Sequence, residues 1–312
     1  MSRLFRRYVT LAVGTAGQEA LRAWSDLQIG FSVKQDSRSK PNKAQIQVTN
    51  LTQESRDIME EDNMTVVLWA GYTEQPPVLF MGDVADVSHK KSGGDWVTTI
   101  ETGDGERSYQ LSHVNQSFRA GVTNRQVLKK VVQATGLGLG HIAAIPEVQY
   151  TQGYVASGLT RLVLDDICQA VGAAWSIQDG ALQVTNKDSG TNDSALLLSP
   201  ETGLIGVPER KRTKGKKAKR NAGVKITSLL SPWVRPGRYI RLESEKINGF
   251  FLVKSVEHRG ETKGPTFYTT METTEVGGVR ERGQTKPTQS EETLDIKVVP
   301  GEYARQVLDL LT

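Results

Sequence analysis

Short runs in which hydrophobic and polar residues alternate fill the first hundred positions of the chain. Alternation with a period of two is the pattern of a strand with one buried face, and it predicts strands at residues 8–13, 29–34, 44–49, 64–72, 78–88 and 95–102. Residues 64–72 are largely apolar, which favours burial on both faces. Thr52 predicts the N-cap of a short helix that ends near Met59. Six strands and one small helix favour a small antiparallel barrel or sandwich.

The pattern changes after residue 104, where helical periods appear. Thr123 and Gln126 have the spacing of a capping box, and the apolar stripe after them predicts a helix that ends at Gly136. Ser157 predicts the cap of a second helix, which runs to Gly172. A hairpin with strands at 174–177 and 181–185 then turns on Asp179–Gly180. The region between residues 105 and 190 is therefore predicted to be a mixed α/β insert.

Strand patterns return from residue 196 onward. Runs at 196–198, 204–205 and 224–230 precede three consecutive strands, predicted at 238–243, 250–258 and 266–273. Asn248–Gly249 predicts a tight type I′ turn between the first two of these, since both residues tolerate positive φ. The chain is predicted to be mainly β with an α/β insert.

The last three strands resemble an earlier stretch of the chain. Val253, Val256 and His258 have the same mutual spacing as Val84, Val87 and His89, and residues 269–273 (TTMET) echo residues 98–102 (TTIET). The second copy has a loop two residues longer. Self-similarity at long spacing favours a duplicated supersecondary unit. The alternative is two β-meanders that share Thr and Val because strands favour these residues.

The end of the chain differs in composition from the rest. After Val276 the sequence is polar to about Glu292, which is typical of a linker. Residues 303–311 carry Val307, Leu308 and Leu311, a spacing that fits a short helix docking on a partner. A frayed tail fits it equally well.

Composition excludes several classes of protein. The chain has 312 residues with 30 glycines, 11 prolines, one cysteine (Cys168) and four scattered histidines. A single cysteine excludes a disulfide framework and a Cys-based zinc site. No apolar run has the length of a membrane span, and the basic start is not followed by the apolar segment of a signal peptide. We therefore expect a protein made in a cytoplasm, where it stays or is built into something larger.

The net charge of +4 is concentrated in one basic run, residues 211–220. Such clusters of Lys and Arg track phosphates in nucleic-acid-binding proteins. No aromatic residue is interleaved to stack on bases, and the run lies between two predicted strands. A solvated hairpin loop is the favoured interpretation, and contact with nucleic acid or an acidic partner is the alternative.

Other ionisable residues give no catalytic signature. The carboxylates at 60–62 and at Asp165 and Asp166 are expected to be solvated helix faces. His89 and His258, at equivalent places in the repeat, are expected to make structural hydrogen bonds at strand ends. Lipase, Walker, dinucleotide-binding and zinc-protease motifs are absent. We assign no catalytic, cofactor-binding or metal site, and we expect a protein that is not an enzyme.

Several segments resemble the baseplate hub proteins of contractile-tailed bacteriophages, the tail hub or late control protein D-like family. The resemblance covers about residues 5–275 and is distributed over turns and strand edges: residues 42–51 (NKAQIQVTNL), 70–72 (AGY), 80–83 (FMGD), 95–98 (DWVT), 175–180 (WSIQDG), 200–206 (PETGLIG) and 235–237 (RPG). The basic run looks longer than the family pattern, and the tail after Val276 lies outside it.

The resemblance implies two related tube-type antiparallel β-barrel domains per chain, at residues 1–103 and 191–276. The insert would then be residues 104–190, and 277–312 a linker and C-terminal tail. It also implies a homotrimer whose six similar units join a six-fold tail tube to a three-fold central spike in the virion baseplate. Its partners would be itself, the tail tube protein, the spike protein and other baseplate proteins, with DNA only as cargo and no cofactor.

Three alternatives to this function are compatible with the sequence. The hub of a related injection device, such as a tailocin or a secretion-system spike, has the same architecture. A hub fused to a lysin needs a further domain with paired acidic residues, for which the length leaves little room. A nucleic-acid-binding module would depend on residues 211–220.

Overall fold

The computed structural model describes residues 6–15, 21–143, 145–186, 190–191, 194–210, 223–276, 279–281 and 294–299. The chain divides into two compact units. Unit 1 contains Met1–Asp188 together with Gly260–Pro265, and unit 2 contains Ser189–Arg259 and Thr266–Thr312. The fold is mainly β, with antiparallel pairing in most of its ladders.

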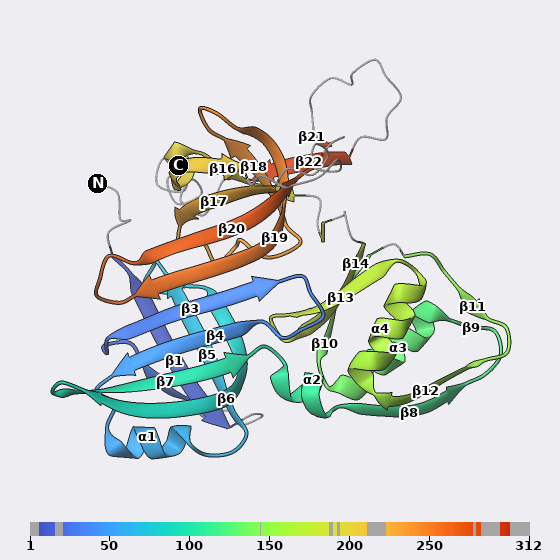
Figure 1. Ribbon diagram of the computed structural model, residues 1–312, viewed down its shortest axis with the longest axis horizontal. Helices are drawn as coiled ribbons and strands as arrows, with labels where there is room; N and C mark the ends of the chain where they lie inside the picture. The colour runs from blue at the N-terminus through green and yellow to red at the C-terminus, as the bar shows by residue number, and fades with distance from the viewer. Residues whose placement is uncertain are drawn as a thin grey trace. The chain divides into compact units, whose positions relative to one another are not determined.

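The first part of unit 1 is an antiparallel sheet (Figure 1). Its strands are β1 (Tyr8–Thr15), β2 (Arg22–Trp24), β3 (Ile29–Asp36), β4 (Lys43–Thr49), β5 (Met64–Gly71), β6 (Val78–Ser92) and β7 (Asp95–Gly103). Their order is β2-β1-β5-β6-β7-β4-β3, and no pairing between described residues joins β2 to β3. The six strands expected from alternation are confirmed, and β2 was missed. The pairings of the described residues do not close the sheet into a barrel.

Burial follows the alternation that predicted these strands. In β4, Ala44, Ile46 and Val48 are buried while Lys43, Gln45 and Gln47 are exposed. The β5 strand is buried on both faces, as its apolar run predicted, with only Thr65 and Trp69 half-buried. The sheet therefore has a core lined by alternate residues of neighbouring strands.

A short helix, α1 (Gln53–Met59), follows β4. The Thr52 hydroxyl accepts a hydrogen bond from the Ser55 N–H, which confirms the predicted N-cap. The Arg56 guanidinium donates to the Leu51 carbonyl at 2.7 Å and lies 4.6 Å from the centre of the Trp96 ring. This cation is buried because the carbonyl and the ring face replace water.

The insert of unit 1 contains three helices and three small sheets. The helices are α2 (Glu106–Leu111), α3 (Asn124–Thr135) and α4 (Thr160–Ala170). The strands are β8 (His113–Phe118), β9 (Val122–Thr123), β10 (Gly138–Ile142), β11 (Gln149–Tyr150), β12 (Tyr154–Leu159), β13 (Ala173–Gln178) and β14 (Ala181–Asn186). They pair as β8–β12, β9–β11 and β10-β14-β13. Helices α3 and α4 lie side by side (Figure 1).

The insert has a hydrophobic core of its own, and the capping residues at its first long helix behave as predicted. The core draws on α3, α4 and the strands around them, and includes Leu128, Val131, Leu164, Ile167, Trp175 and Val184. Thr123 and Gln126 form the capping box of α3, and Gly136 ends the helix with φ 72°. The β13–β14 hairpin turns on Asp179–Gly180, both with positive φ, as a type I′ turn requires.

The predicted cap at Ser157 is wrong. Ser157 lies in β12, opposite Asn115 of β8, and α4 begins at Thr160. The Thr160 N–H donates to the Ser112 carbonyl at 3.0 Å instead of to a side-chain cap. Pairing with a strand more than forty residues away in the sequence therefore overrides the local preference of serine for a cap.

Unit 2 is a second β structure. Its strands are β15 (Ser194–Leu198), β16 (Leu204–Arg210), β17 (Gly223–Leu229), β18 (Tyr239–Glu243), β19 (Asn248–Glu261), β20 (Phe267–Glu275), β21 (Val279–Glu281) and β22 (Leu294–Val299), with a 3₁₀ turn at η1 (Pro200–Thr202). Parallel pairs join β15 to β18 and to β22. The strands β21 and β22 lie in the stretch that the sequence predicted to be linker and tail.

The predicted two-residue turn at Asn248–Gly249 is also wrong. Glu243 pairs with Asn248 and Leu242 with Gly249, so both residues belong to β19. The turn comprises the four residues before them. Ser244 closes it, since its hydroxyl bonds both the N–H and the carbonyl of Ile247. The wider loop allows Ile247 to be buried in the core of unit 2.

The two units share a strand order. The five strands β3 to β7 are arranged as β5-β6-β7-β4-β3, and the five strands β16 to β20 are arranged as β18-β19-β20-β17-β16. Registers agree as well, because Thr98 is opposite Val48 in the first sheet and Thr269 is opposite Ser228 in the second. The repeated residues of the sequence thus occupy equivalent positions in two sheets of the same topology.

Within the part of the chain that the structure describes, no helix has both the length and the apolar character needed to cross a membrane.

Candidate functional site

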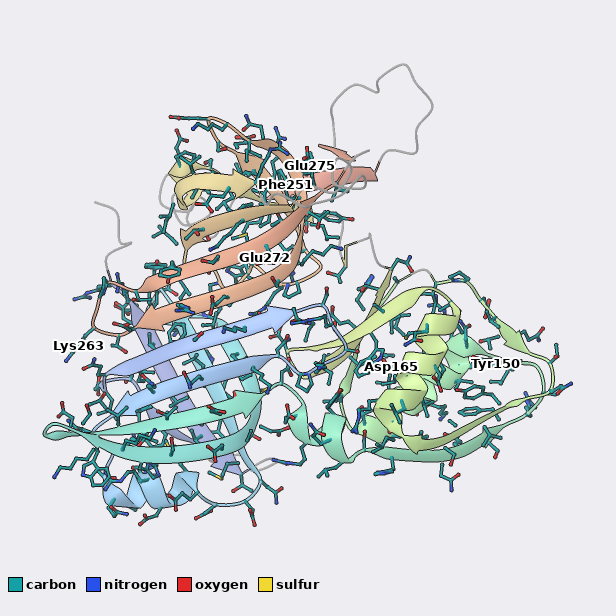
Figure 2. All side chains as sticks on the ribbon, in the orientation of Figure 1. Tyr150, Asp165, Phe251, Lys263, Glu272 and Glu275 are labelled. Carbon is teal, nitrogen blue, oxygen red and sulfur yellow. The ribbon has the colours of Figure 1, made fainter. Side chains whose placement is uncertain are left out.

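The carboxylates that the sequence singled out are not brought together. Glu60, Glu61 and Asp62 are exposed at the end of α1. Asp165, on α4 (Figure 2), accepts a hydrogen bond from the indole N–H of Trp175 at 2.8 Å. The expectation of a solvated face is therefore wrong for Asp165, which fixes the orientation of a core tryptophan. Asp166 next to it is exposed.

Metal-ligand groups, the cysteine and the basic run were also considered as functional sites, and none of them forms a reactive site among the described residues. Among the described residues, no three His, Cys, Asp or Glu side chains are grouped so as to hold a metal ion. Burial raises the pKa of Cys168 to about 12, with a further contribution from Asp165, so its thiol stays protonated. The basic run at residues 211–220 and the predicted terminal helix at 303–311 lie outside the described residues.

The two repeated histidines make the same hydrogen bond. The Nδ1 atom of His89 lies 2.9 Å from Thr98 Oγ1, and Nδ1 of His258 lies 2.9 Å from Thr269 Oγ1. In both pairs the threonine is fully buried. The structural role predicted for these histidines is therefore confirmed. Their equivalence comes from a cross-strand His–Thr pair that each unit contains.

The surroundings of the two histidines differ. His89 is half-buried, and its Nε2 lies 3.2 Å from Glu60 Oε1, an ion pair when the ring is protonated. His258 is wholly buried, and burial lowers its pKa, with the charge of Arg235 adding to the effect. The Ser231 N–H donates to Thr269 Oγ1 at 2.9 Å, so we assign the hydroxyl proton to the bond with His258 Nδ1. The buried ring is then neutral, with its proton on Nε2.

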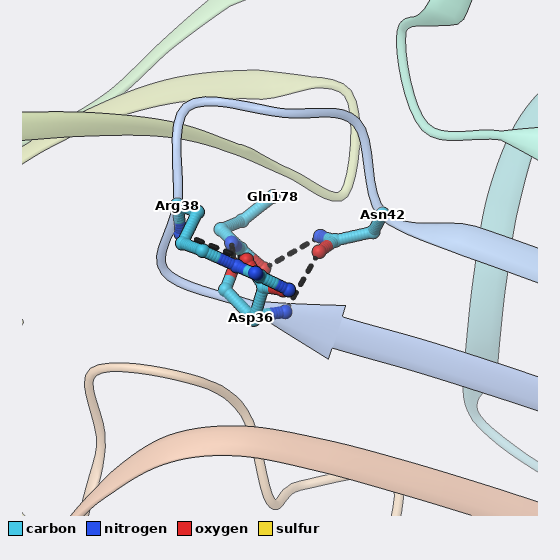
Figure 3. Close-up of polar contacts among 4 residues, drawn as sticks. All are labelled: Asp36, Arg38, Asn42 and Gln178. Carbon is cyan, nitrogen blue, oxygen red and sulfur yellow. Dashed lines mark hydrogen bonds and ion pairs between the residues drawn. The ribbon is translucent and has the colours of Figure 1, made fainter.

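A buried polar joint connects the sheet of unit 1 to its insert (Figure 3). We use this name for Asp36, Asn42, Asp104, Gln178 and the Asp179–Gly180 turn. The Asn42 amide donates to the Ile177 carbonyl and to Gln178 Oε1, both at 2.9 Å, and its oxygen accepts from the Asp36 N–H. Gln178 in turn donates to the Asp36 carbonyl at 2.7 Å. The loop after β3 and the β13–β14 hairpin are thereby tied at a buried position.

Asp104 closes the other side of this joint. Its two carboxylate oxygens accept from the N–H groups of Asp179 and Gly180 at 2.7 and 2.8 Å. The type I′ turn presents both N–H groups to one side, which is why it can hold a carboxylate. Burial nevertheless raises the pKa of Asp104 to about 6, because the cost of removing the charge from water exceeds the gain from these donors.

The joint has almost no signature in the sequence. Its only local signal is a set of polar residues directly beside strand ends, such as Asn42 before β4 and Asp104 after β7. Nothing in that signal identifies the partners, because Asn42 and Gln178 are separated by more than a hundred residues. Only the folded insert brings them together.

The raised pKa of Asp104 predicts a pH dependence. The unfolded carboxyl has a pKa near 3.8 and the folded one near 6, so the folded state binds more protons in this window. Its contribution to stability is complete below about pH 4 and is lost as the pH rises to about 6, with a slope of at most ~1.4 kcal/mol per pH unit. In Asp104→Asn, this part of the slope should disappear from urea unfolding curves measured at pH 4 to 7.

Asp26→Asn is the matched control for that measurement, since it removes an exposed carboxyl that lies outside the joint. An unchanged slope in Asp104→Asn would contradict the assignment of the pH dependence to the joint.

Residues 8–273 match the protein family described as baseplate hub gp41. A comparison with curated protein sequences gives no match. Among solved structures, a tail protein from Neisseria meningitidis MC58 is similar, with a TM-score of 0.61 and 12% sequence identity over 88% of this chain and 98% of that one. The 43 kDa tail protein of prophage MuSo2 from Shewanella oneidensis has a TM-score of 0.57 and 9% identity over 84% and 95% of the two chains.

The c3393 protein of E. coli is also similar, with a TM-score of 0.60 and 12% identity over 85% of this chain and 77% of that one. It is described as a component of the type VI secretion system with structural similarity to the tail proteins gp27 and gp5 of bacteriophage T4. At these identities the three structures show a common fold.

Proposed function

Because the chain belongs to the baseplate hub gp41 family of phage tail proteins, we propose that three copies form a ring that joins the six-fold tail tube to the three-fold central spike. The observation that supports this most directly is the shared strand order of the two units, with the same His–Thr pair in each. Two related tube-type domains per chain, repeated three times, give six similar units around one axis. A ring of this kind matches a six-fold partner on one side and a three-fold partner on the other.

The remaining parts of the chain have secondary roles in this proposal. The domains are residues 1–103 and 191–276, and the insert at 104–190 lies outside the ring, where it binds neighbouring baseplate proteins. In the segment after residue 276, β22 pairs with β15, and we place the contact with the spike at this end of the chain. DNA passes through the central channel as cargo, so residues 211–220 lie away from the lumen, where a basic loop would retain phosphates. The role is structural and requires no catalytic step.

The experiment is the molar mass of the purified full chain by light scattering, followed by electron microscopy of the main peak. We expect three chain masses and a ring with a central pore. A monomer that forms no ring even when it is mixed with tube and spike proteins would contradict the proposal. Basic side chains of residues 211–220 lining the pore would contradict their placement alone.

A related injection device, a tailocin or a secretion-system spike, is the alternative within the same architecture. The observation that supports this alternative is the similarity in fold to a component of the type VI secretion system. DNA inside purified particles distinguishes the two, since a phage tail conducts DNA.

A further inference from the structure

Unit 1 receives a segment from far along the chain at the outer edge of β3. This segment is Gly260–Pro265, the tip of the β19–β20 hairpin, in which Figure 2 labels Lys263. The Thr262 N–H donates to the Ile29 carbonyl at 2.8 Å, and the Ile29 N–H donates to Thr262 Oγ1 at 3.1 Å. Arg7 also donates to the Gly264 carbonyl. One hairpin tip thus makes a single rung of strand pairing at Ile29.

The register of β3 explains why Ile29 is the acceptor. The Thr49 N–H donates to the Gln28 carbonyl, so Gln28 is at a hydrogen-bonded position opposite Thr49 at the end of β4. Ile29, opposite Val48, is at a non-hydrogen-bonded position, and its own N–H and carbonyl face the outer edge of the sheet.

The equivalent edge of unit 2 is β16. There the Leu229 N–H bonds the Gly203 carbonyl, and Leu204 is opposite Ser228, which repeats the arrangement around Ile29. Among the described residues, β16 pairs only with β17. One difference is that the Leu204 N–H already donates to Ser199, which leaves the carbonyl to face outward.

Exposed apolar side chains lie beside this edge. Ile205 is 42% exposed and Val207 is 56% exposed. In the corresponding strand of unit 1, residues 30–33, which follow Ile29, are buried or half-buried. The ladder is irregular after Ile205, with Gly206 at φ 68° and Pro208 lacking an N–H. A strand that approaches the outer edge of β16 can therefore pair regularly only at its first rung. This places the rung at Leu204.

The equivalent hairpin tip is that of β6 and β7. His89 and Thr98 occupy the places of His258 and Thr269, so residues 90–96 correspond to the tip that seats on Ile29. These residues are exposed, and a Cβ added at Gly94 meets nothing within 4 Å. Among the residues that the structure describes, no edge strand receives the β6–β7 tip and no hairpin tip pairs with β16.

We propose that the β6–β7 tip of one copy seats on the β16 edge of a second copy, with its rung at Leu204, and covers Ile205 and Val207. This proposal rests on the proposed ring and gives it a defined contact. The contact is heterologous, which is the type of contact that the proposed three-membered ring requires, with each chain donating one tip and receiving one. The Ile29–Thr262 rung inside unit 1 and the proposed rung at Leu204 between chains are then two versions of one hairpin-on-edge contact.

The test uses Gly94→Cys and Ile205→Cys in the full chain, treated with a short bis-maleimide. Buried Cys168 stays in place, since its protonated thiol does not react. We expect the double variant to give covalent dimers and trimers, and each single variant to give none, because a heterologous contact never brings two like positions together. Gly94→Cys with Val155→Cys is the matched control, in which the second cysteine is exposed on the insert.

The outcomes separate this contact from the ring itself. A trimeric mass without cross-linked trimers would overturn the contact and leave the ring. A monomer that forms no ring even when it is mixed with tube and spike proteins would overturn both. Cross-linking in the Ile205→Cys single variant would indicate a symmetric contact between two β16 edges and would also overturn the proposal. As a second measurement, Val207→Glu should raise the dissociation constant of the trimer at least tenfold, and Val155→Glu should leave it unchanged.

Discussion

Thr269→Val should destabilise the protein by about 3 to 4 kcal/mol, although valine has almost the same shape as threonine. Thr269 Oγ1 is the partner of His258 Nδ1 and of the Ser231 N–H, and all three groups are buried. Removing the hydroxyl leaves a ring nitrogen and a backbone N–H without a partner, each of which costs about 1–3 kcal/mol. Urea unfolding of the purified chain measures the loss.

Two related substitutions make this result interpretable. Thr98→Val removes the equivalent hydroxyl of unit 1, where half-buried His89 has access to water, so we expect a loss of only about 1 kcal/mol. Thr270→Val changes the neighbouring half-buried position and should be near neutral. Equal losses at Thr98 and Thr269 would show that the deep burial of His258 does not matter.

Asn42→Leu should also cost about 3 to 4 kcal/mol, because it removes the centre of the polar joint. The Asp36 N–H, the Ile177 carbonyl and Gln178 Oε1 would all lose a bond to Asn42, in a place from which water is excluded. Leucine has a similar volume, so a cavity does not contribute to the loss. Thermal unfolding followed by circular dichroism measures it.

The expected change is also local. Amide hydrogen exchange should speed up at residues 177–180 and 36–42 more than in the helices of the insert, whose core does not contain Asn42. Asn115→Leu, at an exposed position of β8, is the control and should fall within about 0.5 kcal/mol of the parent. Uniform exchange over the insert would contradict a local role for the joint.

Local pattern was sufficient to predict the strands of the first sheet and the caps at Thr52 and Thr123. In those places a side chain satisfies a backbone group two or three residues away, so the sequence contains both partners. It was not sufficient at Ser157 and Asn248. At these positions the backbone pairs with another strand, β8 for Ser157 and β18 for Asn248. The register of such a pairing cannot be predicted from the preferences of nearby residues.

The same distinction applies to the site. The structural role of the two histidines was predictable because the repeat placed each of them on the strand before a threonine-rich strand, although their threonine partners were not predicted. The joint around Asn42 and Asp104 was not, since its partners come from an insert with its own fold. The partners of these polar residues can be identified only when the topology of the fold is known.

The opposite ionisation behaviour of two buried groups gives the units different responses to acid. Asp104 in unit 1 binds a proton more readily in the folded state, since its pKa is raised to about 6. His258 in unit 2 resists protonation when folded, because burial lowers its pKa, so its contribution to stability is lost as the pH falls below about 6.5. Mild acid therefore strengthens the attachment of the insert while it weakens the core of unit 2. We therefore expect acidification to shift the stabilities of the two units in opposite directions.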